Sequence, residues 1–342
     1  MFTLAVNGSY PKQPEPPRPR LLMRAVEHHR CGELDDRGLA RAIDRATVEI
    51  AMEMIAAGVE VISDGQLRWP DAISYICAKL AGFDVQTSSY GFFEPPPSPP
   101  RAMDRIGWER PIVLDDYRFL SERSPVEVRP VLTGPFSIAR RCDPGVYGTD
   151  IEKLTYDLAV ALNRELEGLS DAGAKYILIE EPLLTRRKDE IEVFVEASEM
   201  LCAGITAQVM LGTAHGDLVG IEDALLETGF AGFGFDLIEG PENEMILSRT
   251  NFWEGRIVQL GLVNARNERL ESAMEVALGL IKYSKHHDPG LIWAAPTAGL
   301  IELPRDLAFK KITNLCAGAD WSRHEMARRE EPGGRLPRAD EN

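Results

Sequence analysis

Apolar residues of the chain gather in short, nearly uninterrupted runs, which are separated by longer stretches with helical spacing. Eight such runs cover residues 2–6, 59–63, 128–132, 175–179, 207–211, 232–238, 257–263 and 291–294. Runs of this length and composition are typical of parallel strands that are buried on both faces. The run at 175–179 has the most abrupt end, because Glu180, Glu181 and Pro182 follow it directly.

Every run except the first, which leads into a proline-rich loop, is promptly followed by a helical pattern. The predicted helices include residues 36–57, 66–80, 150–172, 188–201, 219–227 and 269–285. Regular alternation of strand and helix indicates an α/β protein with a parallel sheet, and eight such units fit a (β/α)8 TIM barrel. A doubly wound sheet is the rival, but no GxGxxG motif follows the first strand.

Two segments depart from this alternation. Residues 83–125 are irregular, with a proline cluster at 95–100, and they predict an insertion after the second βα unit that could act as a lid. Residues 321–342 are polar and predict a disordered tail. We therefore expect a single barrel domain over residues 1–320.

Composition and charge limit the classes of molecule that the protein can bind. The chain has 342 residues and a net charge of -16, which disfavours nucleic acid and anionic membranes as partners and leaves a small-molecule substrate. Its five scattered cysteines form no CxxC pair, and no long apolar stretch or leader pattern occurs. These features predict a soluble, cytoplasmic protein with reduced thiols. They leave its oligomeric state open.

The polar residues that follow the predicted strands are the candidates for chemistry. In a barrel they converge on one mouth although they are far apart in the sequence. Carboxylates there perturb one another's pKa and can serve as acid or base, and a histidine can do the same near neutral pH. The candidates are Ser9, Asp64, Glu180, Glu181, His215, Asp236, Glu239, Asn264 and Arg266. P-loop, HExxH, GxSxG and kinase signatures are absent from the sequence.

Six strand-end motifs, in this order, resemble cobalamin-independent methionine synthase over about residues 1 to 320. They are Asn7-Gly8-Ser9-Tyr10-Pro11, Ser63-Asp64-Gly65-Gln66, Leu132-Thr133-Gly134-Pro135, Ile179-Glu180-Glu181-Pro182, Gly261-Leu262-Val263-Asn264 and Ala298-Gly299-Leu300. The resemblance corresponds to the catalytic barrel alone. It implies transfer of a methyl group from a methylated folate to the thiol of homocysteine, which a zinc ion activates.

The expected zinc ligands are missing from this sequence. The family's ligands are a His and a Cys after the fifth strand, a Glu after the sixth and a Cys after the eighth. The matching positions hold Gly212, Ala214, Leu237 or Glu239 depending on the alignment, and Ala298, while His215 lies one step beyond the cysteine's place. A catalytic zinc needs at least three protein ligands, so we expect no metal.

Three further substitutions alter the family's pattern. Gln66 replaces an acid, Glu180 replaces the Asp before Glu-Pro, and Arg266 falls where the family has a proton-donating His. Gly8 and Ser9 are still suited to hold a carboxylate, and Arg266 offers a bidentate anion site.

The leading hypothesis is a zinc-free methyltransferase-like enzyme that transfers a one-carbon or related group to a small acid. Ser9 and Arg266 would bind the acceptor's polar end and Glu180 its amine or hydroxyl, while Glu181 or His215 would act as acid or base. Gly8, Asp64, Gln66 and Asn264 complete the predicted substrate site. A metal-free lyase or decarboxylase, resembling the related uroporphyrinogen decarboxylase fold, is the alternative. A non-catalytic binding protein ranks last.

Overall fold

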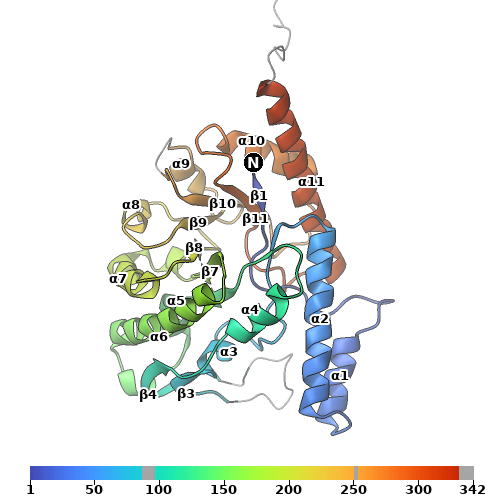
Figure 1. Ribbon diagram of the computed structural model, residues 1–342. Helices are drawn as coiled ribbons and strands as arrows, with labels where there is room; N and C mark the ends of the chain where they lie inside the picture. Colours follow the sequence, from blue (N-terminus) through green and yellow to red (C-terminus); the bar gives the residue numbers. More distant parts are fainter. Residues whose placement is uncertain (87–95, 97, 250–252, 331–342) are drawn as a thin grey trace, which may run out of the picture.

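The computed structural model describes residues 1–86, 96, 98–249 and 253–330. Within these residues a curled parallel sheet forms the centre of the molecule, and helices cover its outer face (Figure 1). The seven hydrogen-bonded strands of this sheet follow the order β1 (Thr3–Leu4), β11 (Ile292–Pro296), β10 (Ile257–Val263), β9 (Gly232–Asp236), β8 (Gln208–Gly212), β7 (Tyr176–Glu180) and β6 (Val131–Thr133). All neighbouring strands of this sheet are parallel.

A short strand pair lies between the two edges of this sheet. β2 (Val61–Ile62) pairs in parallel with β5 (Glu127–Val128), and Arg129 and Pro130 connect β5 to β6. On its other side, Val61 forms a parallel bridge with Ala5, just after β1. Each predicted apolar run overlaps a strand of the structure.

Helices follow the strands along the chain, as the alternation predicted (Figure 1). They are α1 (Leu21–Arg30), α2 (Asp36–Ala56), α3 (Ser74–Cys77), α4 (Leu114–Ser121), α5 (Pro135–Arg141), α6 (Ile151–Asp171), α7 (Ile191–Cys202), α8 (Glu222–Leu225), α9 (Asn243–Leu247), α10 (Ala273–Tyr283) and α11 (Arg305–Glu330). Short 3₁₀ turns are η2 (Gly145–Tyr147), η3 (Leu184–Arg186) and η4 (Lys188–Glu190). Among the described residues, no helix is both long and apolar enough to cross a bilayer.

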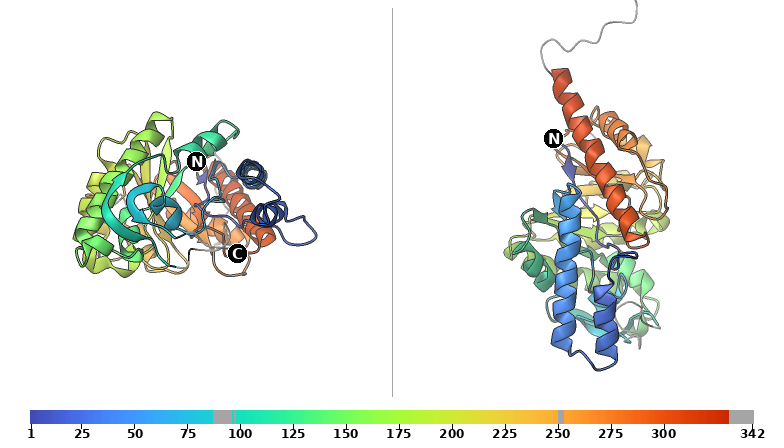
Figure 2. Two further views of the ribbon diagram at one scale, coloured as in Figure 1. Left: turned by 90° about the horizontal axis from the view of Figure 1, so that it is seen from below. Right: turned by 90° about the vertical axis from the view of Figure 1, so that its right-hand side faces the viewer.

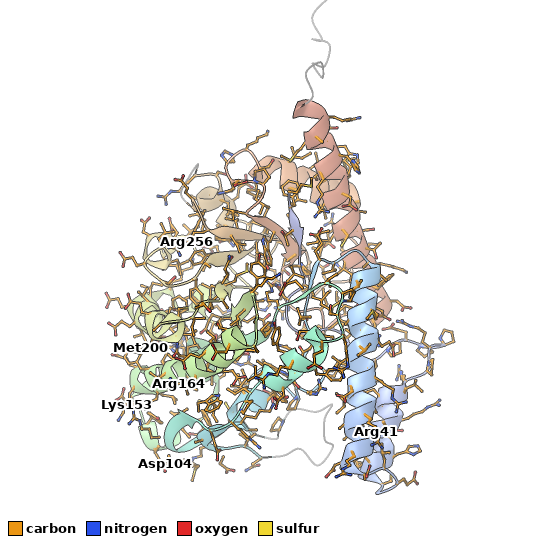
Figure 3. The ribbon with its side chains drawn as sticks, viewed as in Figure 1. Arg41, Asp104, Lys153, Arg164, Met200 and Arg256 are labelled. Carbon is orange, nitrogen blue, oxygen red and sulfur yellow. The ribbon has the colours of Figure 1, made fainter. Side chains whose placement is uncertain are left out.

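Local signals in the sequence fix several helix ends. The Asp35 side chain accepts the backbone N–H of Gly38 and starts α2, whose buried face carries Ile43, Ile50 and Met54. Ser272 and Glu275 form a reciprocal capping box at α10. α1 lies beside α2, and α10 contacts α11 (Figure 2). Charged side chains such as Arg41, Lys153 and Arg164 are exposed on the outer faces of the helices (Figure 3).

Two predicted helices are shorter in the structure. Of the helix predicted at 66–80, only Ser74–Cys77 is α-helical, because Pro70 interrupts it and Asp71 accepts the N–H groups of Ile73 and Ser74 to start a new turn. The helix predicted at 219–227 is reduced to Glu222–Leu225.

The segment predicted to be irregular, 83–125, contains regular structure. β3 (Leu80–Asp84) and β4 (Arg101–Trp108) form an antiparallel hairpin, and α4 follows it. β4 exposes five of its eight residues, so its sequence lacks the apolar run of a buried strand. Pro95 and Pro97 of the proline cluster lie outside the described residues.

The predicted tail also begins later than expected. α11 continues to Glu330, so residues 321–330 are helical where the polar composition predicted disorder. Residues 331–342 lie outside the described part of the chain.

Candidate active site

A cavity of about 290 Å³ opens at the carboxyl ends of the parallel strands. Its wall includes residues that follow β1, β7, β8, β10 and β11, which are distant in sequence and adjacent in the sheet. Ligand sites of parallel α/β folds are found at this edge. Four predicted site residues line the cavity: Ser9, Glu180, His215 and Arg266.

Glu180 is the carboxylate on the cavity wall. The backbone N–H of Gly8 donates to its Oε1 at 3.4 Å. Burial raises the pKa of Glu180, while the Gly8 N–H and the positive charge of Arg129 act in the opposite direction. An added Cβ at Gly8 would lie 2.5 Å from Nε2 of Gln66, so a larger residue at this turn requires the Gln66 side chain to shift.

Glu181 lies on the opposite face of the strand end, away from the cavity. Its side chain is 1% exposed and accepts the backbone N–H groups of Phe136 at 3.0 Å and Ser137 at 2.7 Å. These are free N–H groups of the first turn of α5, so the carboxylate caps that helix. Glu181 was predicted as an acid or base, but this position gives it a structural role, and we leave it out of the proposed chemistry.

We expect Glu181→Gln to destabilise the fold by about 1–3 kcal/mol, because one N–H group of α5 then faces an amide NH2 instead of an acceptor. Burial raises the pKa of Glu181 to about 7, above the ordinary 4.5. The unfolded chain therefore loses this proton first, and the stability that the group contributes at low pH is lost as pH rises through about 7. Denaturant unfolding at several pH values should show a wild-type advantage that shrinks between pH 5 and 8. The exposed Glu199→Gln is the control, and a difference that does not change with pH would contradict this assignment.

His215 and Arg266 meet at the other side of the cavity. His215 Nδ1 lies 3.0 Å from Glu239 Oε2 and 3.2 Å from Arg266 Nη1, and the guanidinium is 3.6 Å from the same Glu239 oxygen. With a proton on Nδ1 the ring donates to Glu239, and without one it accepts from Arg266. Arg266 also lies 3.4 Å from Glu302.

The backbone at this site is unusual. His215 and Gln66 have φ values of 63° and 51°, the positive-φ non-glycine positions among the described residues. Side chains rarely adopt this left-handed conformation, and such positions gather at functional sites. The buried Asp236 stabilises the turn by accepting the N–H groups of His215, Ile238 and Glu239 at 2.9–3.1 Å.

His215, Asp236 and Glu239 are the residues to test for a metal, because one ligand atom of each lies within 4.8 Å of the others. Both Asp236 oxygens already accept backbone N–H groups, and the Arg266 cation contacts the other two side chains. The cysteines are not among the cavity-lining residues. A metal ion at this position would compete with the Arg266 guanidinium and with the N–H groups that Asp236 accepts.

The other predicted site residues lie behind the cavity wall. Asp64 accepts the N–H of Gln66, and burial together with the charge of Asp116 raises its pKa to about 6. Asn264 accepts the N–H groups of Arg266 and Asn267 and so shapes the turn that presents Arg266. Gly8, Asp64, Gln66, Glu181 and Asn264 are not part of the lining.

Sequence reasoning missed several polar residues of the cavity. Asn7, Gln259, Arg141 and Glu302 line it, and Arg129 lies beneath its floor. Gln259 and Arg129 interrupt predicted apolar strands, which is a usable signal because buried polar groups need partners. Arg141, at the end of α5, carries no such signal.

The fold and the cavity define an α/β enzyme-like protein with a candidate ligand site at the carboxyl ends of a parallel sheet. Comparison with known proteins makes this more specific. The family model described as "Cobalamin-independent synthase, N-terminal domain" matches residues 100–283. The chain therefore belongs to the cobalamin-independent synthase family, as its motifs indicated, and is a methyltransferase-like enzyme. The matching model is that of the N-terminal domain, whereas the motifs pointed to the catalytic barrel.

Similarity to known proteins extends over nearly the whole chain. Methionine synthase of Sulfurisphaera tokodaii is 28% identical over 334 residues, covering 94% of this chain and 92% of that protein. Methionine synthase of Thermococcus kodakarensis is 28% identical over 330 residues, with coverage of 95% and 94%. The structure of a B12-independent methionine synthase from Shewanella sp. W3-18-1, in complex with selenomethionine, matches with a TM-score of 0.80 at 19% identity and coverage of 96% and 99%.

Proposed function

We propose that this protein transfers a methyl or related one-carbon group from a methylated folate to a small acid without a bound metal. The observation that carries the proposal is the contact of Arg266 with His215 and Glu239, which places a guanidinium among the candidate metal ligands. The relatives named methionine synthase support the reaction class.

Each cavity residue has a role in this proposal. Ser9 and Arg266 bind the acidic end of the acceptor, because a guanidinium recognises a carboxylate with two parallel hydrogen bonds. Glu180 binds the acceptor's amine or hydroxyl. His215 moves a proton, since its ring nitrogen lies between an acid and a cation.

The transfer step balances with these groups. The acceptor atom forms a bond to the methyl carbon, the bond between that carbon and the folate nitrogen breaks, and the nitrogen keeps the electron pair and takes a proton. A thiol acceptor must lose its own proton. Without a metal its pKa stays near about 8.5, so transfer to a thiol should become faster as pH rises towards that value.

The scaffold of the proposed enzyme is a single (β/α)8 barrel, whose last helix, α11, extends past the predicted boundary at residue 320 to Glu330. The Ala5–Val61 bridge and the β2–β5 pair support closure of the sheet into eight strands. A cluster inside the curl supports it too, formed by Ala5, Val61, Val131, Leu178, Met210, Ile257 and Trp293. The hairpin β3–β4 and α4 are then an insertion between the second and third barrel strands.

Methyl-folate consumption by the purified protein tests the proposal. Homocysteine and a series of small amino and hydroxy acids serve as acceptors, and demethylated folate and methylated acceptor are measured together. We expect the two products in equal amounts. Absence of transfer to every acceptor, combined with no binding of methyl-folate by calorimetry, would refute it.

A further inference from the structure

Arg129 is a cation buried inside the curl of the sheet. It lies between β5 and β6 and has no exposed surface. Its guanidinium lies 5.4 Å from the centre of the Trp293 ring, and Nη1 is 3.5 Å from Sδ of Met210. Met210 and Trp293 belong to the apolar cluster inside the curl, so the guanidinium lies in surroundings that would normally exclude a charge.

The guanidinium fixes two amide side chains of the cavity. Nη1 donates to Gln259 Oε1 at 2.8 Å, and Nη2 donates to the Val6 carbonyl at 2.8 Å and towards Asn7 Oδ1 at 3.5 Å. Gln259 Nε2 then donates to Asn7 Oδ1 at 3.0 Å, and Asn7 Nδ2 donates to the Pro296 carbonyl at 2.9 Å. Because arginine only donates, it sets the direction of this whole chain of hydrogen bonds.

The hydrogen-bond acceptors of Arg129 are all neutral, and its Nε has no partner among the described residues. Burial lowers the pKa of Arg129 to about 10, and the negative charge of Glu180 opposes that effect. The interaction is reciprocal, because Arg129 favours the ionised form of Glu180 against the effect of burial. Neutral acceptors alone compensate a buried charge poorly. The negative charge of Glu180 therefore helps to stabilise the Arg129 guanidinium.

Other charged groups around the same cavity come from different elements. Arg141 lies at the end of α5, His215 follows β8, Arg266 follows β10 and Glu302 follows β11. Arg266 contacts Glu239 and Glu302, whereas Arg129 acts on Glu180 from within the sheet. The segment 6–8 connects Arg129 with Glu180, because the guanidinium donates to the Val6 carbonyl and towards Asn7 Oδ1, and the next N–H along the chain, that of Gly8, donates to Glu180.

We propose that Arg129 is a positioning residue of the active-site cavity, acting as the buried counter-charge of Glu180 and as the anchor of Asn7 and Gln259 on its floor. With both amides directed inward, the charge of Arg129 favours the ionised form of Glu180, which can receive a cationic amine from the acceptor. The use of Glu180 by an acceptor rests on the proposed function. The coupling between Arg129 and Glu180 does not, because it is measured on the ligand-free protein.

The test is the titration of Glu180 in protein labelled with carbon-13 at the glutamate carboxyl groups, followed by NMR and assigned with Glu180→Gln. Arg129→Met removes the charge and keeps an unbranched side chain. We expect the titration midpoint of Glu180 to move to a higher pH in this variant than in the wild type. Arg129→Lys, which keeps the charge, should leave it near the wild-type value. An unchanged midpoint in folded Arg129→Met would overturn the proposal.

Two variants at Gln259 separate charge from packing and remain informative if Arg129→Met does not fold. Gln259→Leu removes a hydrogen bond to Arg129 but leaves the cation, so the Glu180 midpoint should not move. Gln259→Glu places a second acid against Arg129, competes with Glu180 for the cation and should raise the midpoint. No rise in Gln259→Glu, or an equal rise in Gln259→Leu, would show that Arg129 is merely structural. A protein without methyl transfer can still show the expected shifts, so failure of the proposed function remains distinguishable.

Discussion

Glu180→Gln is expected to weaken binding of an amino-acid acceptor by about 100-fold or more. Glu180 is the cavity-lining carboxylate that the Gly8 N–H and the buried Arg129 support. Loss of its charge leaves a bound ammonium group in the cavity without its counter-ion. Removing one partner of such a desolvated pair costs about 2–5 kcal/mol, and about 1.4 kcal/mol corresponds to tenfold in affinity.

Calorimetry with L-methionine and a hydroxy-acid analogue checks this expectation. The variant should lose its preference for the amine, while its thermal unfolding stays close to that of the wild type. Glu192→Gln, an exposed change on α7, is the matched control and should bind as the wild type does. If Glu180→Gln binds the amino acid with wild-type affinity, Glu180 is not the amine site.

Arg266→Gln is expected to lower kcat/KM for an acidic acceptor roughly 100-fold, because the carboxylate of the acceptor loses its charged, bidentate partner. In the wild type the guanidinium contacts His215, Glu239 and Glu302. Without the guanidinium, the carboxylates of Glu239 and Glu302 have no cation between them, and their negative charge repels an anionic acceptor. Arg266→Lys should fall between the two, since it keeps the charge but loses the planar fork.

Initial rates with methyl-folate over a range of acceptor concentrations measure kcat/KM, and kcat at saturating acceptor shows whether Arg266 also acts in the transfer step. The control is Arg164→Gln, which removes an exposed arginine on α6 that pairs with Glu167. Such a surface pair contributes little to stability, so its loss should not affect kcat/KM. A wild-type kcat/KM in Arg266→Gln would exclude Arg266 from the reaction.

The positions of the strands were predictable because a strand that is buried on both faces consists of a nearly uninterrupted run of apolar residues. The run at 257–263 coincides with β10, and that at 175–179 differs from β7 by one residue. Helix prediction failed where short-range hydrogen bonds decide the structure. Asp71 starts α3 at Ser74, and only four residues of the segment predicted at 66–80 are α-helical. The exposed hairpin β3–β4 was missed because partly exposed strands lack an apolar run.

The sequence predicted which strand ends form the site, but it did not predict the direction in which each side chain points. Glu180 and Glu181 are equivalent in a sequence, yet one lines the cavity and the other caps α5. The rule that neighbours on a strand face opposite sides predicts such a division without saying which residue faces inward. Arg129 was placed in a predicted strand but was not recognised as a residue beneath the cavity. Only its hydrogen bonds to Gln259 and to the Val6 carbonyl, which the fold brings together, show why a cation is buried there.

The most direct test of metal-free group transfer is to measure zinc and turnover on the same preparation. The protein is purified without chelator, its zinc content is determined by elemental analysis, and methyl-folate turnover is compared before and after chelation. The Arg266 guanidinium beside His215 and Glu239 predicts zinc far below one ion per chain and turnover that chelation does not change. One zinc ion per chain, with turnover lost on chelation and restored by zinc, would contradict the account.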